Sequence, residues 1–368
     1  MNNPQRRIRY GVIGLGHIAQ AAVLPAFEHA ENAELAALFS RDREKLKVLG
    51  NQYGVQTRAS YDDFETVLRR ERIDAVYIAL PNHLHREYTI RAAKAGCHVL
   101  CEKPMALNEQ ECWDMIHAAN DARIKLMIAY RLHFEEANLS CVELIESGVI
   151  GDPRFFDSVF AFPAKEGNIR TRKKTGGGPL YDIGIYCINA VRYLFRSEPV
   201  EVVAIGSAKR VGEVEETVSA IMRFPEERIA SFTCSFGTAH VAKYSVSGTK
   251  GEILLENAYQ YTGDMIQKVI VNEETSQTKF AQRDQFAPEL IYFSNCILND
   301  VEPEPSGYEG LADIRVIEAI QKAERTARAV VVEPLSRAIR PDLDQAIDRE
   351  AVEEPKPVHA ESPKKEAA

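Results

Sequence analysis

Three polar side chains, Lys103, Asp182 and Tyr186, could carry out acid–base chemistry together. Lys103 follows an apolar run over residues 97–101 that predicts a buried strand, and the carboxyl end of such a strand faces a ligand crevice. Asp182 and Tyr186 are four residues apart on a predicted helix, so they share one face. An acid and a phenol on one face can hydrogen-bond one substrate hydroxyl. The alternative is an amphipathic helix with an ordinary polar stripe.

A glycine-rich turn near the N-terminus predicts what lies beside these groups. Gly14-x-Gly16-x-x-Ala19 follows a predicted strand over residues 8–13 and precedes a helical pattern, which is the order of the dinucleotide-binding fingerprint. Gly14 allows the tight turn, Gly16 lets the backbone approach a pyrophosphate, and Ala19 lets the helix pack closely on the strand. The diphosphate is expected at the positive end of that helix. An ordinary strand-to-helix turn is the alternative.

Residues after the second predicted strand indicate which dinucleotide binds. Ser40 stands where NAD sites usually carry an acid for the ribose hydroxyls, and Arg41 follows it. A hydroxyl and a guanidinium suit a 2′-phosphate, because arginine forms charge-assisted bidentate bonds to phosphate, and Lys45 lies one turn further on. Asp42 is expected to cap the next helix. The predicted cofactor is therefore NADP, and a solvated arginine beside a serine cap is the alternative.

The order of elements predicts an α/β protein with two domains. Residues 1–130 alternate strand and helix patterns, which implies a parallel Rossmann sheet with ligands at its carboxyl edge. Residues 131–335 contain mostly β-rich runs, which predict an α+β domain with a large, mainly antiparallel sheet and later helices that return to the first domain. Residues 341–368 are rich in Glu, Lys, Pro and Ala and predict a flexible tail.

Composition excludes several classes of protein. The net charge of −9 argues against non-specific nucleic-acid binding, and −4 of it falls beyond residue 340, where eight acidic and four basic residues occur. No apolar run is long enough to span a bilayer, and the first residues lead directly into a strand, so a cytoplasmic protein is expected. Seven scattered cysteines predict buried, reduced thiols; Cys97, His98 and Cys101 lack further ligands for a metal site.

Together, these motifs resemble the glucose–fructose oxidoreductase/inositol dehydrogenase family. The glycine fingerprint, Glu102-Lys103-Pro104 and Gly176-Gly177-Gly178 followed by Asp182-x-Gly184-x-Tyr186 occur in that family in the same order, and the likeness covers residues 7–335. Tyr130-Arg131-x-x-Phe134 also resembles the family. Most members have histidine at the position of Tyr186, and tyrosine there resembles the glucose–fructose oxidoreductase branch. The periplasmic enzyme of that branch has an N-terminal arm around its cofactor; this chain begins at its first strand, so retention of NADP is left open.

The resemblance implies reversible hydride transfer between NADP(H) and a sugar or related polyol carbonyl. Tyr186 is expected to act as general acid/base, with the Lys103 ammonium favouring its phenolate form and binding the substrate oxygen. Asp182 is expected to hold a neighbouring sugar hydroxyl, and Arg131 to add a further polar contact. One alternative is a dehydrogenase for xylose, a deoxy-keto sugar or a trans-dihydrodiol that releases NADP at each turnover. Another is a non-catalytic nucleotide-binding regulator.

The resemblance also implies a larger set of cofactor contacts and a homo-oligomer, either a dimer or a tetramer. No metal is expected. The residues expected to bind the cofactor are Gly14, Gly16, His17, Ile18, Ser40, Arg41, Lys45, Leu80, Pro81, Asn82, His85, Glu102, Lys103 and Arg131.

Overall fold

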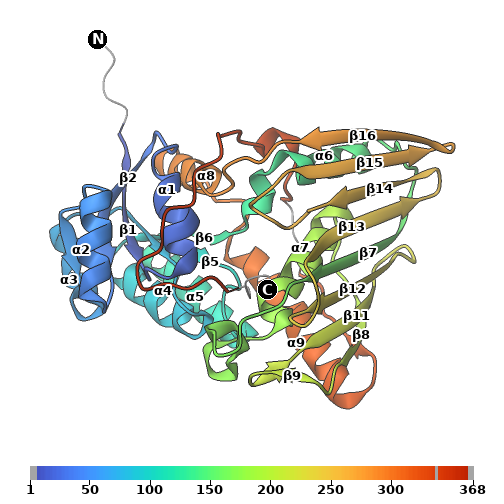
Figure 1. Ribbon diagram of the computed structural model, residues 1–368, viewed down its shortest axis with the longest axis horizontal. Helices are drawn as coiled ribbons and strands as arrows, with labels where there is room; N and C mark the ends of the chain where they lie inside the picture. The colour runs from blue at the N-terminus through green and yellow to red at the C-terminus, as the bar shows by residue number, and fades with distance from the viewer. Residues whose placement is uncertain (1–5, 336–338, 364–368) are drawn as a thin grey trace, which may run out of the picture. The chain divides into compact units, whose positions relative to one another are not determined.

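The computed structural model describes residues 6–335 and 339–363 (Figure 1). They form two compact units, each with its own sheet. The first unit contains residues 6–131, 284–311 and 349–362, and the second contains most of the remainder. The chain therefore leaves the first unit after residues 131 and 311 and returns to it at residues 284 and 349.

The first unit is built on a six-stranded parallel sheet with the order β3-β2-β1-β4-β5-β6. Its central strands are almost continuously apolar because helices cover both faces of a parallel sheet; all four residues of β4 are buried. The strands are β1 (Ile8–Ile13), β2 (Ala33–Phe39), β3 (Thr57–Ala59), β4 (Ala75–Ile78), β5 (His98–Glu102) and β6 (Leu126–Ala129). The expected Rossmann sheet is confirmed.

Apart from α8, the helices of the first unit follow the carboxyl ends of these strands. Local capping fixes where two of them start: Asp42 accepts from the backbone N–H groups of Glu44 and Lys45, and Asn108 accepts from that of Glu111. The helical segments are η1 (Ala19–Val23), α1 (Leu24–Ala26), α2 (Arg43–Gln52), η2 (Tyr61–Asp63), α3 (Phe64–Arg70), η3 (Asn82–Leu84), α4 (His85–Lys94), α5 (Glu109–Ala122) and α8 (Ala287–Leu298). The predicted cap at Asp42 is confirmed.

The second unit contains a nine-stranded sheet with the order β16-β15-β14-β13-β7-β12-β11-β8-β17. Its pairs are antiparallel except β7 with β12, which are parallel. β11 alternates between buried and more exposed residues, which is the pattern of a sheet with one covered face. The strands are β7 (Pro153–Ala161), β8 (Glu201–Gly206), β11 (Thr217–Arg223), β12 (Ile229–Ser235), β13 (Val241–Gly248), β14 (Gly251–Glu256), β15 (Met265–Val271), β16 (Glu274–Phe280) and β17 (Val330–Val331), with a separate hairpin of β9 (Arg210–Val211) and β10 (Val214–Glu215).

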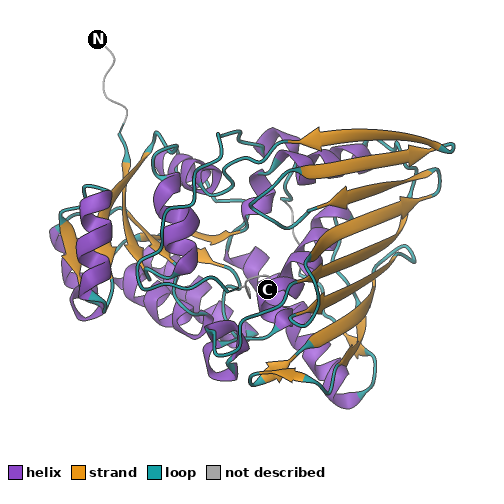
Figure 2. Cartoon of the chain, in the orientation of Figure 1, coloured by secondary structure: helices purple, strands orange, loops and turns teal. Residues whose placement is uncertain are grey.

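The helices of the second unit lie on one face of its sheet (Figure 2). α6 contacts β14, and α7 contacts β7 at the centre of the sheet. The helical segments are η4 (Arg131–Phe134), α6 (Glu136–Glu146), η5 (Ile169–Thr171), η6 (Lys173–Thr175), η7 (Leu180–Gly184), α7 (Ile185–Leu194), α9 (Gly307–Thr326) and η8 (Leu343–Gln345), of which η4 and α9 begin in the first unit. The expected α+β domain is confirmed.

Several general expectations can be compared with the described residues. All seven cysteines are free and buried. Within the described part of the chain, no helix is long and apolar enough to cross a membrane, and no group of His, Cys, Asp or Glu could hold a metal ion.

The C-terminal stretch differs from its prediction as a flexible tail. Residues 339–363 are described and make defined contacts, such as that between the Arg340 guanidinium and Glu198. Low apolar content is the signal for disorder, but here individual polar side chains and backbone groups are paired with groups on both units. Residues 364–368 of the predicted tail lie outside the described residues.

Candidate active site

The glycine turn after β1 has the shape that a dinucleotide requires. Gly14 has φ +92°, and a Cβ there would meet the Ala79 carbonyl oxygen at 2.4 Å, so only glycine fits between β1 and β4. At Gly16 a Cβ would have no heavy atom within 4 Å, which leaves the backbone open to an approaching group. His17 and Ile18 follow, both half-buried, and lead into η1. The turn therefore fits a pyrophosphate at the start of a helix.

The end of β2 carries the polar groups expected to select the nucleotide. The Ser40 hydroxyl accepts from the Asp42 N–H at 3.0 Å and can still donate its own hydrogen to a ligand. The Arg41 guanidinium lies 5.3 Å from the centroid of the Tyr61 ring, a stacked arrangement that holds the side chain at the strand end. Burial lowers the pKa of Lys45, and the neighbouring Asp42 carboxylate opposes this effect.

An open hollow of about 500 Å³ adjoins Ser40 and Arg41. Four arginines and one acid lie in its lining, so its charge is positive, which suits a phosphate. The lining residues are Ser40, Arg41, Arg43, Leu46, Arg58, Ala59, Ser60, Asp63, Thr66, Val67 and Arg70. The residues present at this edge therefore fit a dinucleotide that carries an additional phosphate on its adenosine ribose.

His85 lies between the loops after β4 and β5, and its expected contact with the cofactor remains a prediction. The side chain is completely buried, with Nδ1 2.9 Å from the Pro104 carbonyl oxygen and Nε2 2.8 Å from that of Leu80. Both ring nitrogens are thus used within the protein, and burial lowers the pKa of the imidazole. His85 therefore joins the loop after β4 to the loop after β5.

Glu102 and Lys103 lie where β5 ends, and the Lys103–Pro104 peptide is cis. Tyr77 donates to Glu102 Oε1 at 2.8 Å and lies 3.5 Å from Glu289 Oε2. These three side chains are called the acidic cluster below. Burial raises the pKa of both carboxyls, while the Lys103 and Arg131 cations oppose the shift at Glu102. Glu289 Oε1 is buried without a hydrogen-bond partner. Such burial costs less free energy for a protonated carboxyl than for a carboxylate.

Arg131 is buried at the end of the first unit and donates to the Gln285 side-chain oxygen. Its charge also acts on both carboxyls of the acidic cluster. Arg131 therefore belongs to the polar surroundings of Lys103. Its predicted contacts with cofactor and substrate remain predictions.

Asp182 and Tyr186 lie in the second unit, on η7 and the first turn of α7. Arg170 Nε donates to Asp182 Oδ2 at 2.8 Å, so a guanidinium orients the carboxylate. The half-buried Tyr186 ring packs edge-on against Phe160, with 5.6 Å between ring centroids, and lies 6.0 Å from Tyr259. Neighbouring aromatic rings thus restrict the rotation of the phenol that sequence analysis assigns to proton transfer.

The triple glycine before η7 has a structural reason. A Cβ on Gly177 would meet the Arg170 carbonyl oxygen at 2.3 Å, and Gly176 and Gly178 have φ of +78° and +129°. At Gly177 the group that approaches closely is the backbone of residues 170–172, and Arg170 in this stretch contacts Asp182.

Comparisons with known proteins find matches to both units of the chain. The model of an oxidoreductase family with an NAD-binding Rossmann fold matches residues 8–130, and that of the GFO/IDH/MocA C-terminal domain matches residues 139–254. The chain belongs to the GFO/IDH/MocA oxidoreductases. The expected resemblance is confirmed.

Members of the GFO/IDH/MocA family with known activities are similar over most of the chain. D-xylose 1-dehydrogenase (NADP⁺) from Haloarcula marismortui is 32% identical, and the match covers 88% of this chain and 92% of the relative. The structure of aldose-aldose oxidoreductase from Caulobacter crescentus complexed with glycerol is 38% identical with a TM-score of 0.85, covering 89% of this chain and 100% of that one. A 3-ketoreductase from Actinomadura kijaniata, in complex with NADP and TDP-benzene, is 28% identical with a TM-score of 0.80 and 86% and 98% coverage.

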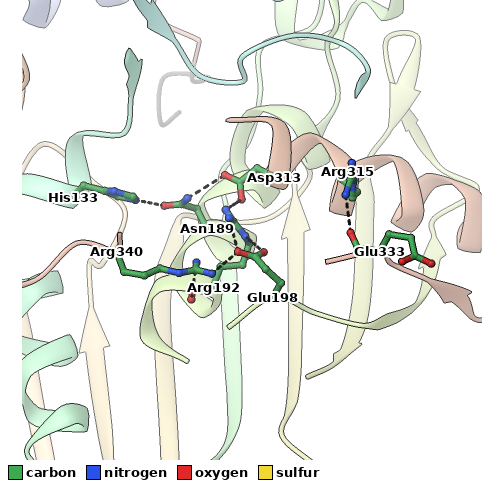
Figure 3. A network of polar contacts seen from close by, with 8 residues as sticks. All are labelled: His133, Asn189, Arg192, Glu198, Asp313, Arg315, Glu333 and Arg340. Carbon is green, nitrogen blue, oxygen red and sulfur yellow. Dashed lines mark hydrogen bonds and ion pairs between the residues drawn. The ribbon is translucent and has the colours of Figure 1, made fainter. Parts of the chain in front are cut away.

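Asn189, three residues beyond Tyr186 on α7 of this GFO/IDH/MocA member, points into a buried polar network (Figure 3). Its side chain lies 2.8 Å from His133 Nε2 and donates to Asp313 at 3.1 Å. Arg192 pairs with Asp313 at 2.5 Å and with Glu198 at 2.6 Å, and Arg340 also pairs with Glu198. Arg192, Glu198, Asp313 and Arg340 are called the ion-pair cluster below. The network fixes the helix that carries Tyr186.

Sequence reasoning missed several residues of the site. Arg58 and Arg70 lie in the positive hollow but come from β3 and α3, which were not predicted as separate elements. Glu289 comes from α8, far along the chain, and has no local motif. Arg170 lies in a run of basic residues that reads as a solvated loop. Of these four residues, only Glu289 reaches its unit through the return of a distant segment.

Proposed function

We propose that the chain transfers hydride between NADP(H) and an aldose or a related sugar carbonyl. The supporting observation is the order of polar groups along one sheet edge: Ser40 and Arg41 at β2, the glycine turn at β1, Leu80 and Pro81 after β4, and Lys103 at β5. Strands lie ~5 Å apart, so these groups cover roughly 15 Å, which suits an extended dinucleotide. Bound NADP would supply the hydride acceptor near Lys103.

Side chains of the protein would transfer the proton and bind the substrate oxygens. Tyr186 accepts the proton of the sugar hydroxyl as the carbon loses hydride, and returns it in the reverse direction. The Lys103 ammonium stabilises negative charge on the reacting oxygen. Asp182, oriented by Arg170, accepts a hydrogen bond from a neighbouring sugar hydroxyl and fixes which carbon reacts. The relatives' activities with xylose and with aldoses support this substrate class.

The proposal is tested by the near-ultraviolet absorbance of reduced nicotinamide during incubation of the chain with NADP⁺ and a panel of aldoses. Tyr186→Phe and Lys103→Ala should each lower kcat by roughly 10²–10⁴-fold, because each removes a group that acts in the transition state. Tyr181→Phe is the matched control, since the Tyr181 hydroxyl bonds Gln321 and is expected to take no part in the reaction. Undiminished turnover by Tyr186→Phe would reject its role, and NADP binding without any turnover would favour the regulator.

The chain would also form a homo-oligomer through the uncovered face of the large sheet. Phe155, Val203, Ile205, Ile221 and Ile229 are exposed on neighbouring strands, and Ile221 lies opposite Val203 while Phe155 lies opposite Ile229. Paired residues point to the same face, so these side chains form one apolar patch, which a second copy can cover. Ile205→Lys together with Ile221→Lys should lower the sedimentation mass to that of a monomer. An unchanged mass would reject this face as the interface.

A further inference from the structure

Residues 349–362 run across the first unit beside α1 (Figure 1). The path begins at Arg349, which pairs with Glu31 at 2.7 Å and donates to the His29 carbonyl oxygen at 3.1 Å. These residues lie between α1 and the start of β2. Five residues further on, Glu354 Oε1 lies 3.4 Å from Nε2 of His17, next to Gly16. The segment therefore passes from the far end of the sheet to the glycine turn.

Two further contacts continue the path. The Gln20 amide donates to the Val358 carbonyl oxygen at 3.0 Å and accepts from the Val358 N–H at 2.7 Å, so one side chain satisfies both backbone groups. The same amide donates to the Leu15 carbonyl oxygen at 2.9 Å, within the glycine turn. His359 Nδ1 lies 2.9 Å from Asp42 Oδ2, and this hydrogen bond lowers the pKa of Asp42.

The anchoring points lie on both sides of the expected position of the ADP half of the cofactor. His17 adjoins the open backbone of Gly16, where the diphosphate fits, and Asp42 follows Ser40 and Arg41, where the ribose phosphate fits. A segment attached at both points must cross the space between them. A dinucleotide bound to the glycine turn would therefore lie beneath residues 354–359.

Residues 354–359 combine a restricted backbone with exposed side-chain contacts. Pro355 and Pro357 fix two backbone φ angles and so reduce the entropy lost when the segment orders. The side chains of Glu354 and His359, which contact His17 and Asp42, are 49% and 62% exposed, so water competes with both contacts. The contacts that close the segment are thus individually weak, as a cover that must admit and release a ligand requires.

We propose that residues 354–359 form the outer wall of the NADP site and slow the release of bound NADP(H). This inference rests on the proposed function and adds to it.

The test is the release rate of NADPH. Each protein is loaded with NADPH and mixed with excess NADP⁺, and the decay of nicotinamide fluorescence gives the rate. A chain that ends at Glu350 keeps the Arg349 contacts and should release NADPH at least tenfold faster than the full chain. Glu354→Gln combined with His359→Ala should give a several-fold increase. Glu350→Gln combined with Glu353→Gln is the matched control and should leave the rate unchanged.

Several outcomes would overturn the proposal. Equal release rates in the full chain, the truncated chain and the Glu354→Gln/His359→Ala variant would show that the segment does not hold the cofactor. Tighter binding by the shortened chain, through faster association, would show that the segment obstructs the site. If the shortened chain fails to fold by circular dichroism, the double variant decides. Failure of the full chain to bind NADPH at all would reject the proposed function as well.

Discussion

Two buried polar clusters of this molecule, one in each unit, differ in how their charges are balanced. In the ion-pair cluster of the second unit, Arg192 and Arg340 face Glu198 and Asp313, so two cations meet two carboxylates. In the acidic cluster of the first unit, Glu102 and Glu289 share one phenol, Tyr77, and burial raises the pKa of both carboxyls. The first cluster holds a helix in place, whereas in the second cluster burial favours the protonated form of the two carboxyls.

The largest expected effect comes from breaking the ion-pair cluster. Arg192 is completely buried, and Arg192→Ala leaves Glu198 and Asp313 without their shared cation. We expect a loss of about 3–5 kcal/mol in the free energy of unfolding, as for other broken buried ion pairs, measured by urea denaturation. Arg315→Ala is the control, because Arg315 makes a surface contact to the Glu333 carbonyl oxygen (Figure 3). If Arg315→Ala lowered the free energy of unfolding as much as Arg192→Ala, the ion-pair cluster would have no special role in stability.

Removing the phenol hydroxyl of the acidic cluster should lower the free energy of unfolding less than breaking the ion-pair cluster does. Tyr77→Phe keeps the ring in the core but leaves Glu102 Oε1 without its donor. The free energy of unfolding should fall by about 1–3 kcal/mol, the cost of an unsatisfied buried polar group. The kcat of the sugar reaction should also fall, because Glu102 adjoins Lys103. The kcat of Tyr77→Phe is measured as a function of pH. If its stability falls but this pH profile matches that of the wild type, the acidic cluster does not act on Lys103.

Glu289→Gln should have the smallest effect and the opposite sign. The folded-state pKa of Glu289 is raised, so the folded protein binds more protons than the unfolded chain. Its contribution to stability is complete below the unfolded pKa near 4.5 and is lost as pH rises through the folded pKa. Glutamine resembles the protonated acid and should stabilise the chain at alkaline pH by on the order of 1 kcal/mol. Thermal melts from pH 5 to 9 should show a flatter pH dependence than wild type; an identical dependence would contradict this prediction.

Local sequence patterns were sufficient for much of the first unit. Apolar runs, caps and glycines act over a few residues, so β1, the turn at Gly14, the cap at Asp42 and the position of Lys103 could all be predicted. β16 was missed because all but one of its residues are exposed and it shows no alternation. α6, from Glu136 to Glu146, was also missed.

Contacts between distant segments account for the other differences. The pattern of α7 shows a polar stripe, but only the positions of His133 and Asp313 turn Asn189 inward. His85 reads as a polar loop residue, and only the fold places carbonyl oxygens at both of its ring nitrogens. Residues 349–362 lack apolar content, and their order comes from partners more than 300 positions away.

The two edges of the nine-stranded sheet have a consequence for the solution behaviour of the chain. β17, at one edge, has only two residues, and β16, at the other, carries polar side chains at most of its positions. Lys279 on β16 is paired with Asp264, which keeps a charge at that border. Short or charged edge strands resist the addition of further strands. The sheet can therefore leave an apolar face uncovered while its borders discourage growth into fibrils.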